Sequence, residues 1–360
     1  MRVAFVTDGI FPHAVGGMQR HTAALADALV DEGVTIDVIA PSGHEQGDYR
    51  FRVVPLEWPE TRVYPLTLYR WAARCATAVA REPYDVVYGQ GLTLWGRLPR
   101  SAPPSVYHPH GLELCATGER AGDAKAWPLR FGARRQARQA ALTISLGGKL
   151  TDVVERCLGV PRDRIRVVPN AVDASRFDDV ADEPRDPRLI LFVGRLFANK
   201  GLDVLAQAAA ELARDVRVLV VGDGPLREEL ARSSSPQLEL AGPVTDDELR
   251  RLYARASVLA VPSRSDGMPT VILEAFACGT PVVATDVGAI SELVGDETGV
   301  LLPELEPRAL AAALRHLLEL PGDRRAAMAD AARSVVRERF SWRAVARQTV
   351  TVLEEAAALR

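Results

Sequence analysis

The chain has 360 residues, of which 48% are hydrophobic and 25% are charged, a composition that is ordinary for a globular protein. At about 150 residues per domain, this length predicts two domains. The net charge of −3 argues against a general nucleic-acid-binding protein, because such proteins carry a broad basic face. The apolar stretch near the N-terminus is too short for a signal peptide, and no apolar run approaches the about 18 residues that span a bilayer. We therefore expect a cytoplasmic protein, with peripheral contact at the inner face of the membrane as the alternative.

The cysteines are few and scattered, and no two of them form a Cys-x-x-Cys pair. Such spacing is typical neither of a zinc site nor of a disulfide framework. We expect all of them to be reduced thiols in or near the core. They are Cys75, Cys115, Cys157 and Cys278.

The first half of the chain alternates short apolar runs with helical patterns, which indicates parallel α/β architecture. VAFVTD predicts the first strand, and residues 18–32 predict a helix that ends at Gly33, the position of a C′ glycine. Further strands are predicted at TIDVIAP, YDVVYGQG, PSVYHPHG, ALTISLG and IRVVPN. Each of these runs ends in a polar or glycine-rich turn, and that is the end of a strand at which α/β proteins bind ligands.

Residues 169–188 are polar and contain three prolines, so they predict a linker or a loop-rich entry into a second domain. The alternation then restarts with RLILFVG, VRVLVVGDG, LELAG, SVLAVPS and PVVATD. We expect two doubly wound, Rossmann-like domains at 1–167 and 168–340. Residues 341–360 predict a C-terminal helix, which either closes the second domain or crosses back to the first.

Two loops have the composition of anion sites. Gly16 and Gly17 follow the first strand and precede a helix, where glycines allow a ligand to approach the backbone; a plain tight turn is the alternative. Arg195 and Lys200 lie in VGRLFANKG, between a strand and a helix. Two cations beside a helix N-terminus can clamp a diphosphate, whereas the alternative is a pair of solvated loop residues.

Two carboxylates lie eight residues apart in SRSDGMPTVILEAFACG. A helix is predicted from near Thr270 to before Gly279, so Asp266 precedes the helix and Glu274 lies about one turn inside it. The free amides at the start of this helix suit phosphate or sugar oxygens, and Glu274 suits a pair of ribose hydroxyls. Because Glu274 is surrounded by apolar residues, it needs a polar partner.

In order and spacing, these motifs together resemble glycosyltransferase family 4, a retaining family with the GT-B fold. The resemblance runs nearly end to end. It includes the Gly16–Gly17 pair, HG at His110, VVPNAVD, VGRLxxxKG, VVGDGP, AGPVTDDEL, the Asp266/Glu274 block and FSW at 340–342. It implies two Rossmann-like domains that face a central cleft, with the acceptor bound by the first domain and the nucleotide sugar by the second.

The resemblance also implies the roles of single residues. Arg195 and Lys200 would bind the donor diphosphate, Glu274 would hold the ribose, and Asp266 would contact the transferred sugar. Asp266 stands where the family has a glutamate, so its reach is one methylene shorter and the sugar that it selects is open. His110 would lie beside the sugar in the cleft. The remaining donor contacts implied are Gly16, Gly17, Val244, Gly267, Met268, Pro269, Thr270 and Val271.

No metal and no cofactor are expected. No Asp-x-Asp occurs in the sequence, and the His108-Pro-His110 pair has no carboxylate at ligand spacing. The resemblance implies transfer of a hexosyl group from a UDP- or GDP-sugar to a hydroxyl of a glycan, a lipid-linked glycan or a small molecule, with retention. No enzymic nucleophile is evident, so we expect front-face departure of the diphosphate. Two alternatives remain, a GT-B nucleotide-sugar epimerase or hydrolase and a catalytically silent partner of another transferase.

Residues 124–140 contain five cations and no acid. Arg130, Arg134 and Arg138 recur at a spacing of four, so they share one helix face beside Trp127 and Phe131. Such a stripe suits an anionic membrane surface or a polyanionic acceptor, and a merely solvated helix is the alternative. The five cations are Lys125, Arg130, Arg134, Arg135 and Arg138.

Overall fold

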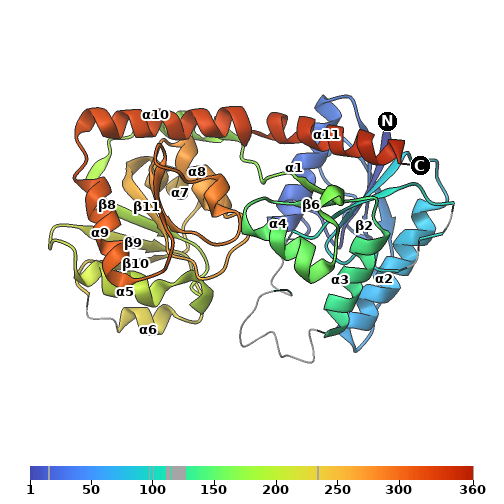
Figure 1. Ribbon diagram of the computed structural model, residues 1–360, viewed down its shortest axis with the longest axis horizontal. Helices are drawn as coiled ribbons and strands as arrows, with labels where there is room; N and C mark the ends of the chain where they lie inside the picture. Colours follow the sequence, from blue (N-terminus) through green and yellow to red (C-terminus); the bar gives the residue numbers. More distant parts are fainter. Residues whose placement is uncertain are drawn as a thin grey trace. The chain divides into compact units, whose positions relative to one another are not determined.

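The computed structural model describes residues 1–14, 17–96, 98–99, 101–110, 115, 127–232 and 235–359 (Figure 1). The chain divides into two compact units: unit 1 is Met1–Asn170 with Trp342–Arg360, and unit 2 is Ala171–Ser341. Each unit is built on one parallel sheet with helical crossovers, so the two doubly wound domains predicted from the alternation of elements are confirmed.

Unit 1 has a seven-stranded sheet in the order β3-β2-β1-β4-β5-β6-β7. Its strands are β1 (Arg2–Val6), β2 (Thr35–Pro41), β3 (Arg52–Leu56), β4 (Val86–Gln90), β5 (Ser105–His108), β6 (Leu142–Ser145) and β7 (Ile165–Val167). Its helices are α1 (Gly17–Asp31), α2 (Tyr64–Val79), α3 (Trp127–Gln139), α4 (Lys149–Val153) and α11 (Trp342–Ala358). A π-helical turn, Val154–Leu158, continues α4, and a 3₁₀ turn, Arg162–Arg164, precedes β7.

Unit 2 has a six-stranded sheet in the order β10-β9-β8-β11-β12-β13. Its strands are β8 (Asp186–Val193), β9 (Arg217–Val221), β10 (Leu238–Gly242), β11 (Ala256–Val261), β12 (Val282–Thr285) and β13 (Gly299–Leu302). Its helices are α5 (Leu202–Ala210), α6 (Arg227–Ala231), α7 (Asp246–Arg255), α8 (Thr270–Ala277), α9 (Pro307–Leu318) and α10 (Gly322–Arg339). Short 3₁₀ turns occupy Ala174–Val180, Ala198–Lys200 and Ile290–Glu292.

The order of the strands sets where each sheet can bind a ligand. In unit 1 the chain winds outward in both directions from β1, so the order reverses between β1 and β4; in unit 2 it reverses between β8 and β11. At such a switch point the loops that follow the two strands diverge, and a crevice opens at the carboxyl edge of the sheet. The residues that follow β1, β4, β8 and β11 are therefore the first candidates for function.

The C-terminal helix α11 packs against α1 within unit 1 (Figure 1). Arg347 on α11 lies 3.2 Å from Glu32, which follows α1, and Glu355 pairs with Arg166 on β7. Val345, Ala346 and Leu353 of this helix are buried, and that burial supplies most of its stability because exposed ion pairs contribute little. Among the described residues, no helix is both long and apolar enough to cross a membrane.

The cysteine prediction is confirmed for two residues and wrong for the other two. Cys75 and Cys278 are buried free thiols, as expected. Cys115 and Cys157 form a disulfide, and their Cα atoms lie 5.9 Å apart. That Cα–Cα distance is within the range that a disulfide requires. It results from the fold, because the two cysteines are 42 residues apart in the sequence, and their spacing alone does not indicate that they pair.

Candidate functional site

Lys200 and Asp266 meet at the switch point of unit 2. Lys200 ends the turn after β8, Asp266 lies in the loop after β11, and Lys200 Nζ is 2.5 Å from Asp266 Oδ2. Both side chains are mostly buried, with 20% and 15% exposed, so solvent screens this pair less than a surface pair. The Ser263 hydroxyl also donates to Oδ2, and the Gly267 amide lies 3.0 Å from Oδ1. The carboxylate of Asp266 is thus held from three sides.

Two glycines allow the loops at this point to approach each other. Gly201 has a φ of 67°, and a Cβ there would lie 1.9 Å from the carbonyl oxygen of Pro262. Gly288 has a φ of 59°, and a Cβ there would lie 2.2 Å from the carbonyl oxygen of Asp266. Any other residue would be strained at these φ values and would push the chains apart. The position of Asp266 beside Lys200 therefore depends on both glycines.

Helix α8 begins four residues after Asp266, at the predicted Thr270. No side chain caps this N-terminus, which carries the positive end of the helix dipole. At the other end, Arg185 donates four hydrogen bonds, to the carbonyls of Ala256, Cys278 and Gly279 and to the Thr280 hydroxyl. Ile272, Leu273 and Phe276 of α8 are fully buried, and each such side chain contributes about 1.5–3 kcal/mol. The helix is therefore anchored at one end and open at the other.

Glu274 has the polar partner that its apolar surroundings require. The hydroxyl of Tyr253, on α7, donates to Glu274 Oε2 over 2.7 Å. Tyr253 is fully buried, and burial, followed by the charge of Glu274, raises the pKa of its phenol well above the ordinary value. Tyr253 therefore stays neutral and acts as a donor. It fixes the carboxylate one turn inside α8.

The other donor-site predictions lie along the same edge of the sheet or on α8. Arg195 follows β8 and is exposed, with its guanidinium carbon 5.0 Å from the centre of the Phe197 ring. Val244 follows β10 and is half-buried. Between Asp266 and α8, Gly267 is half-buried while Met268 and Pro269 are buried; in the first turn of α8, Thr270 is exposed and Val271 is half-buried. Unit 2 thus gathers the predicted residues at the ends of β8, β10 and β11.

In unit 1, His110 follows β5 and has a φ of 56°, in the left-handed region. A non-glycine residue there is uncommon, and such backbone strain concentrates at functional sites. Its Nε2 lies 2.7 Å from Gln90 Oε1, at the end of β4 and hence at the switch point. The side chain of Thr22 on α1 donates to the same oxygen. Gly17 starts α1, and Gly16 and Lys125 lie outside the described residues.

His110 belongs to a cluster of three imidazoles with His21 and His108. The rings of His108 and His110 stack with their centres 3.7 Å apart and their planes at 20°, while His21 meets both edge-on. One ring nitrogen of each of the three lies within 4.8 Å of the others. Metal ligation uses lone pairs that lie in the ring plane, and the lone pairs of two rings stacked at 20° point in nearly parallel directions. The Nε2 atoms of His21 and His108 are buried and have no hydrogen-bond partner among the described residues.

Acidification is expected to destabilise unit 1 through this cluster. Burial lowers the pKa of His21 to about 4, and burial together with the neighbouring imidazoles lowers the pKa values of His108 and His110 well below the ordinary value. Protons therefore bind the unfolded chain more readily, and stability present above about pH 6.5 is lost as the pH falls toward 4. His21 alone accounts for about 3 kcal/mol over that range.

Tryptophan fluorescence during urea unfolding isolates this effect, because all five tryptophans lie in unit 1. The His21→Phe variant should show a shallower decline of the unfolding free energy with acidity than the wild type. Replacing the exposed His316 with Gln is the matched control and should leave the decline unchanged. Equal pH slopes for wild type and His21→Phe would refute the role of the cluster.

Three residues that contact the predicted ones are not indicated by any pattern in the sequence. Tyr253, Ser263 and Gln90 contact Glu274, Asp266 and His110, but only the folded chain brings them there. Asp8 follows β1 at the switch point of unit 1, accepts a hydrogen bond from Gln19, and has its pKa raised by burial. The polar turn after the first strand marked this position in general terms without identifying the carboxylate.

Comparison with known proteins places the chain in a family. Residues 15–176 match the family described as Glycosyltransferase Family 4, and residues 187–320 match Glycosyl transferases group 1. A D-inositol 3-phosphate glycosyltransferase from Kineococcus radiotolerans is 32% identical over 95% of this chain and 91% of the relative. The chain belongs to glycosyltransferase family 4. An α-D-kanosaminyltransferase from Streptomyces kanamyceticus is 28% identical over 63% of each chain.

Solved structures give the same fold for this glycosyltransferase. HepE of Anabaena in complex with UDP has a TM-score of 0.76 at 20% identity and covers 99% of this chain and 100% of its own. Sucrose-phosphate synthase of Thermosynechococcus elongatus has a TM-score of 0.79 at 21% identity, with both chains fully covered. The fold is therefore GT-B, as the sequence resemblance implied.

Proposed function

We propose that this glycosyltransferase moves a hexosyl group from a nucleoside diphosphate sugar to an acceptor hydroxyl, with retention of configuration. The observation that carries the proposal is the meeting of Lys200, Asp266 and the open end of α8 at the switch point of unit 2. A cation and a helix N-terminus side by side suit a diphosphate, and Glu274 beyond them suits a ribose. HepE, which has the same fold, is described in complex with UDP and with UDP-glucose, which favours a UDP-sugar over a GDP-sugar here.

We assign the reacting groups as follows. The bond between the sugar's anomeric carbon and the β-phosphate oxygen breaks, and the acceptor oxygen bonds to that carbon from the same face. The departing β-phosphate oxygen takes the proton of the acceptor hydroxyl, so no enzymic base or nucleophile is required. Arg195, Lys200 and the amides from Gly267 to Val271 stabilise the negative charge that grows on the diphosphate.

The remaining roles complete the site. Asp266 binds hydroxyls of the sugar, His110 lies near the sugar, and the backbone at Val244 meets the base, with Gly16 and Gly17 near the donor. We propose that no metal bridges the diphosphate, since the two basic side chains and the helix end supply the charge. We place the enzyme in the cytoplasm, and we propose peripheral contact with the inner membrane face through the cations of α3.

A panel of nucleoside diphosphates tests the donor by thermal shift. UDP is expected to raise the melting temperature more than GDP or ADP, with EDTA present throughout. At 100 times its dissociation constant a ligand stabilises the protein by about 2.7 kcal/mol, enough to rank the bases. Pyrophosphate is the base-free control and should stabilise less than UDP. If no nucleoside diphosphate changes the melting temperature, the proposed donor class is wrong.

A further inference from the structure

Unit 1 has a surface pocket of about 800 Å³ at the amino edge of its sheet, opposite to the carboxyl edge where His110 lies. The pocket reaches Ser105, the first residue of β5, and Ala141, just before β6. His108 ends β5 three residues later, about 10 Å along the strand. The pocket therefore lies at the amino ends of the strands, whereas His110 lies at their carboxyl ends. It is separate from His110 and from the switch point of unit 1.

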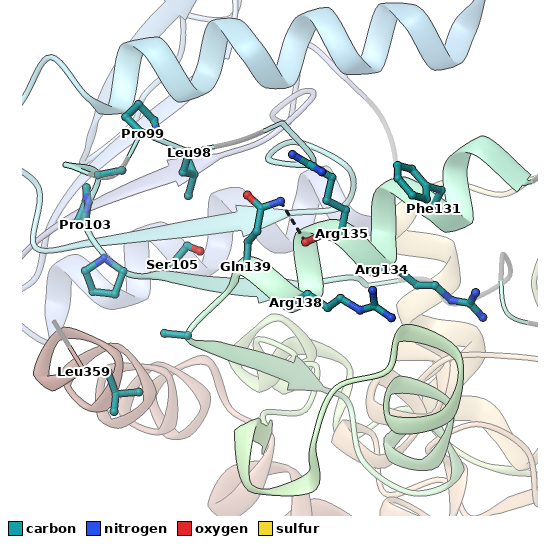
Figure 2. Close-up of a pocket in the computed structure, with 13 residues that line it drawn as sticks. Leu98, Pro99, Pro103, Ser105, Phe131, Arg134, Arg135, Arg138, Gln139 and Leu359 are labelled. Carbon is teal, nitrogen blue, oxygen red and sulfur yellow. Dashed lines mark hydrogen bonds between the residues drawn. The ribbon is translucent and has the colours of Figure 1, made fainter.

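The pocket joins a basic wall to an apolar one. In Figure 2, Arg134, Arg135 and Arg138 come from α3, while Leu98, Pro99 and Pro103 lie across from them. None of the described residues that line the pocket is acidic. Arg134 donates to the carbonyl of Cys157, which leaves the rest of its guanidinium available. No ion pair of Arg134, Arg135 or Arg138 occurs within the described part of the chain. Their charges thus have no carboxylate partner there.

Apolar side chains around the same pocket are exposed. Phe131 lines the pocket with 54% of its surface exposed, and Trp127, one turn earlier on α3, is 66% exposed and stacks on it with ring centres 5.8 Å apart. Leu359, near the end of α11, lines the pocket and is 59% exposed. These are among the most exposed large apolar side chains described, and they gather where the cations are. A soluble anion would pair with the arginines, but it would gain nothing from the exposed apolar side chains around them.

We propose that this docking face, made of Trp127, Phe131, Arg134, Arg135, Arg138 and Leu359, binds the surface of an anionic phospholipid bilayer, with one headgroup phosphate in the pocket. Aromatic rings suit the boundary between headgroups and acyl chains, and arginines pair with lipid phosphates above it. Because the face lies at the amino edge of the sheet, docking leaves the carboxyl edge of unit 1 free. Docking at a bilayer indicates that the acceptor is a lipid-linked molecule. This assignment of the acceptor class rests on the proposed transfer reaction.

Co-sedimentation of the full chain with vesicles tests the docking face. We expect binding to vesicles that contain phosphatidylglycerol, little binding to phosphatidylcholine alone, and weaker binding at high salt. Each arginine near an anionic surface is worth about fivefold in affinity, so Arg135→Glu with Arg138→Glu should weaken binding by well over tenfold. Trp127→Ser should weaken binding at both salt concentrations, because its contribution is apolar.

The matched control replaces Arg308 and Arg324 with Glu. Both are exposed, lie in unit 2 outside the pocket, and give the same change in net charge. This control should bind anionic vesicles as the wild type does. All variants should keep the wild-type melting temperature and its increase with UDP, which separates a failure of docking from a failure of the proposed donor.

Three outcomes would overturn the proposal. Equal binding to neutral and anionic vesicles, or to neither, removes the anionic bilayer as the occupant. Equal losses in the Arg135/Arg138 and Arg308/Arg324 variants would show an effect of net charge alone. Saturable binding of soluble glycerol 1-phosphate at the pocket without any vesicle binding would show a site for a small anion instead.

Discussion

Replacing Arg195 or Lys200 with alanine is expected to lower the turnover of the nucleotide sugar by a factor of about 10²–10³. In the proposed reaction, negative charge grows on the leaving diphosphate as the glycosidic bond breaks. Lys200 is already held at the switch point by Asp266, so its charge needs little reorganisation when the donor binds. Arg195 is exposed and stacks on Phe197, from which it can turn toward the diphosphate. Donor affinity should fall less than turnover, because the charge is largest in the transition state.

Steady-state transfer with and without EDTA measures both variants. EDTA should leave wild-type turnover unchanged, since the proposed mechanism assigns the role of an ion to the two cations and the α8 N-terminus. Arg214→Ala is the matched control, because Arg214 is an exposed cation of unit 2 that lies before β9 at the amino edge of the sheet. Loss of all wild-type activity in EDTA, with recovery in Mg²⁺ or Mn²⁺, would contradict the two-cation account.

The ion pair adds a second consequence to the Lys200 variant. In the proposed site, Lys200→Ala leaves Asp266 without its cationic partner beside the diphosphate. Part of the loss in UDP affinity in Lys200→Ala is therefore repulsion, which Asp266→Asn in the same chain should relieve. A double-mutant cycle on UDP affinity gives the coupling between the two residues. Strictly additive effects would show that the pair does not influence the diphosphate.

The sequence predicted which residues lie at the carboxyl ends of the strands better than it predicted which of those residues contact one another. Each strand that bears predicted site residues ends in a polar or glycine-rich turn, and that pattern placed Arg195, Lys200 and Asp266 at the carboxyl edge of the second sheet, where the structure has them. The helix predicted from near Thr270 to before Gly279 is confirmed as α8, Thr270–Ala277.

The pairings depend on tertiary packing, which local patterns do not encode. Lys200 and Asp266 are 66 residues apart and meet only because β8 and β11 are neighbours in the sheet. The same holds for Tyr253 with Glu274 and for the disulfide of Cys115 with Cys157. His21 matched the periodicity of a helix, so its place beside His110 could be found only from the fold.

Variants of Glu274 and Asp266 are expected to differ in their affinity for UDP when UDP is titrated without an attached sugar. In Glu274→Gln the proposed charged acceptor for the ribose is lost, so UDP should bind about tenfold more weakly, as for one hydrogen bond to a charged group. In Asp266→Asn the affinity for UDP should not fall, because the proposed site assigns Asp266 to the transferred sugar, which UDP lacks. Turnover of the UDP-sugar should nevertheless fall in Asp266→Asn.

Calorimetric titration with UDP alone decides between the two roles, and Tyr253→Phe is the control for orientation. That variant removes the 2.7 Å hydrogen bond to Glu274 and keeps the carboxylate, so its loss of UDP affinity should lie between those of wild type and Glu274→Gln. If Asp266→Asn lowers the affinity for UDP as much as Glu274→Gln does, both carboxylates bind the nucleotide. The division into a ribose contact and a sugar contact would then be wrong.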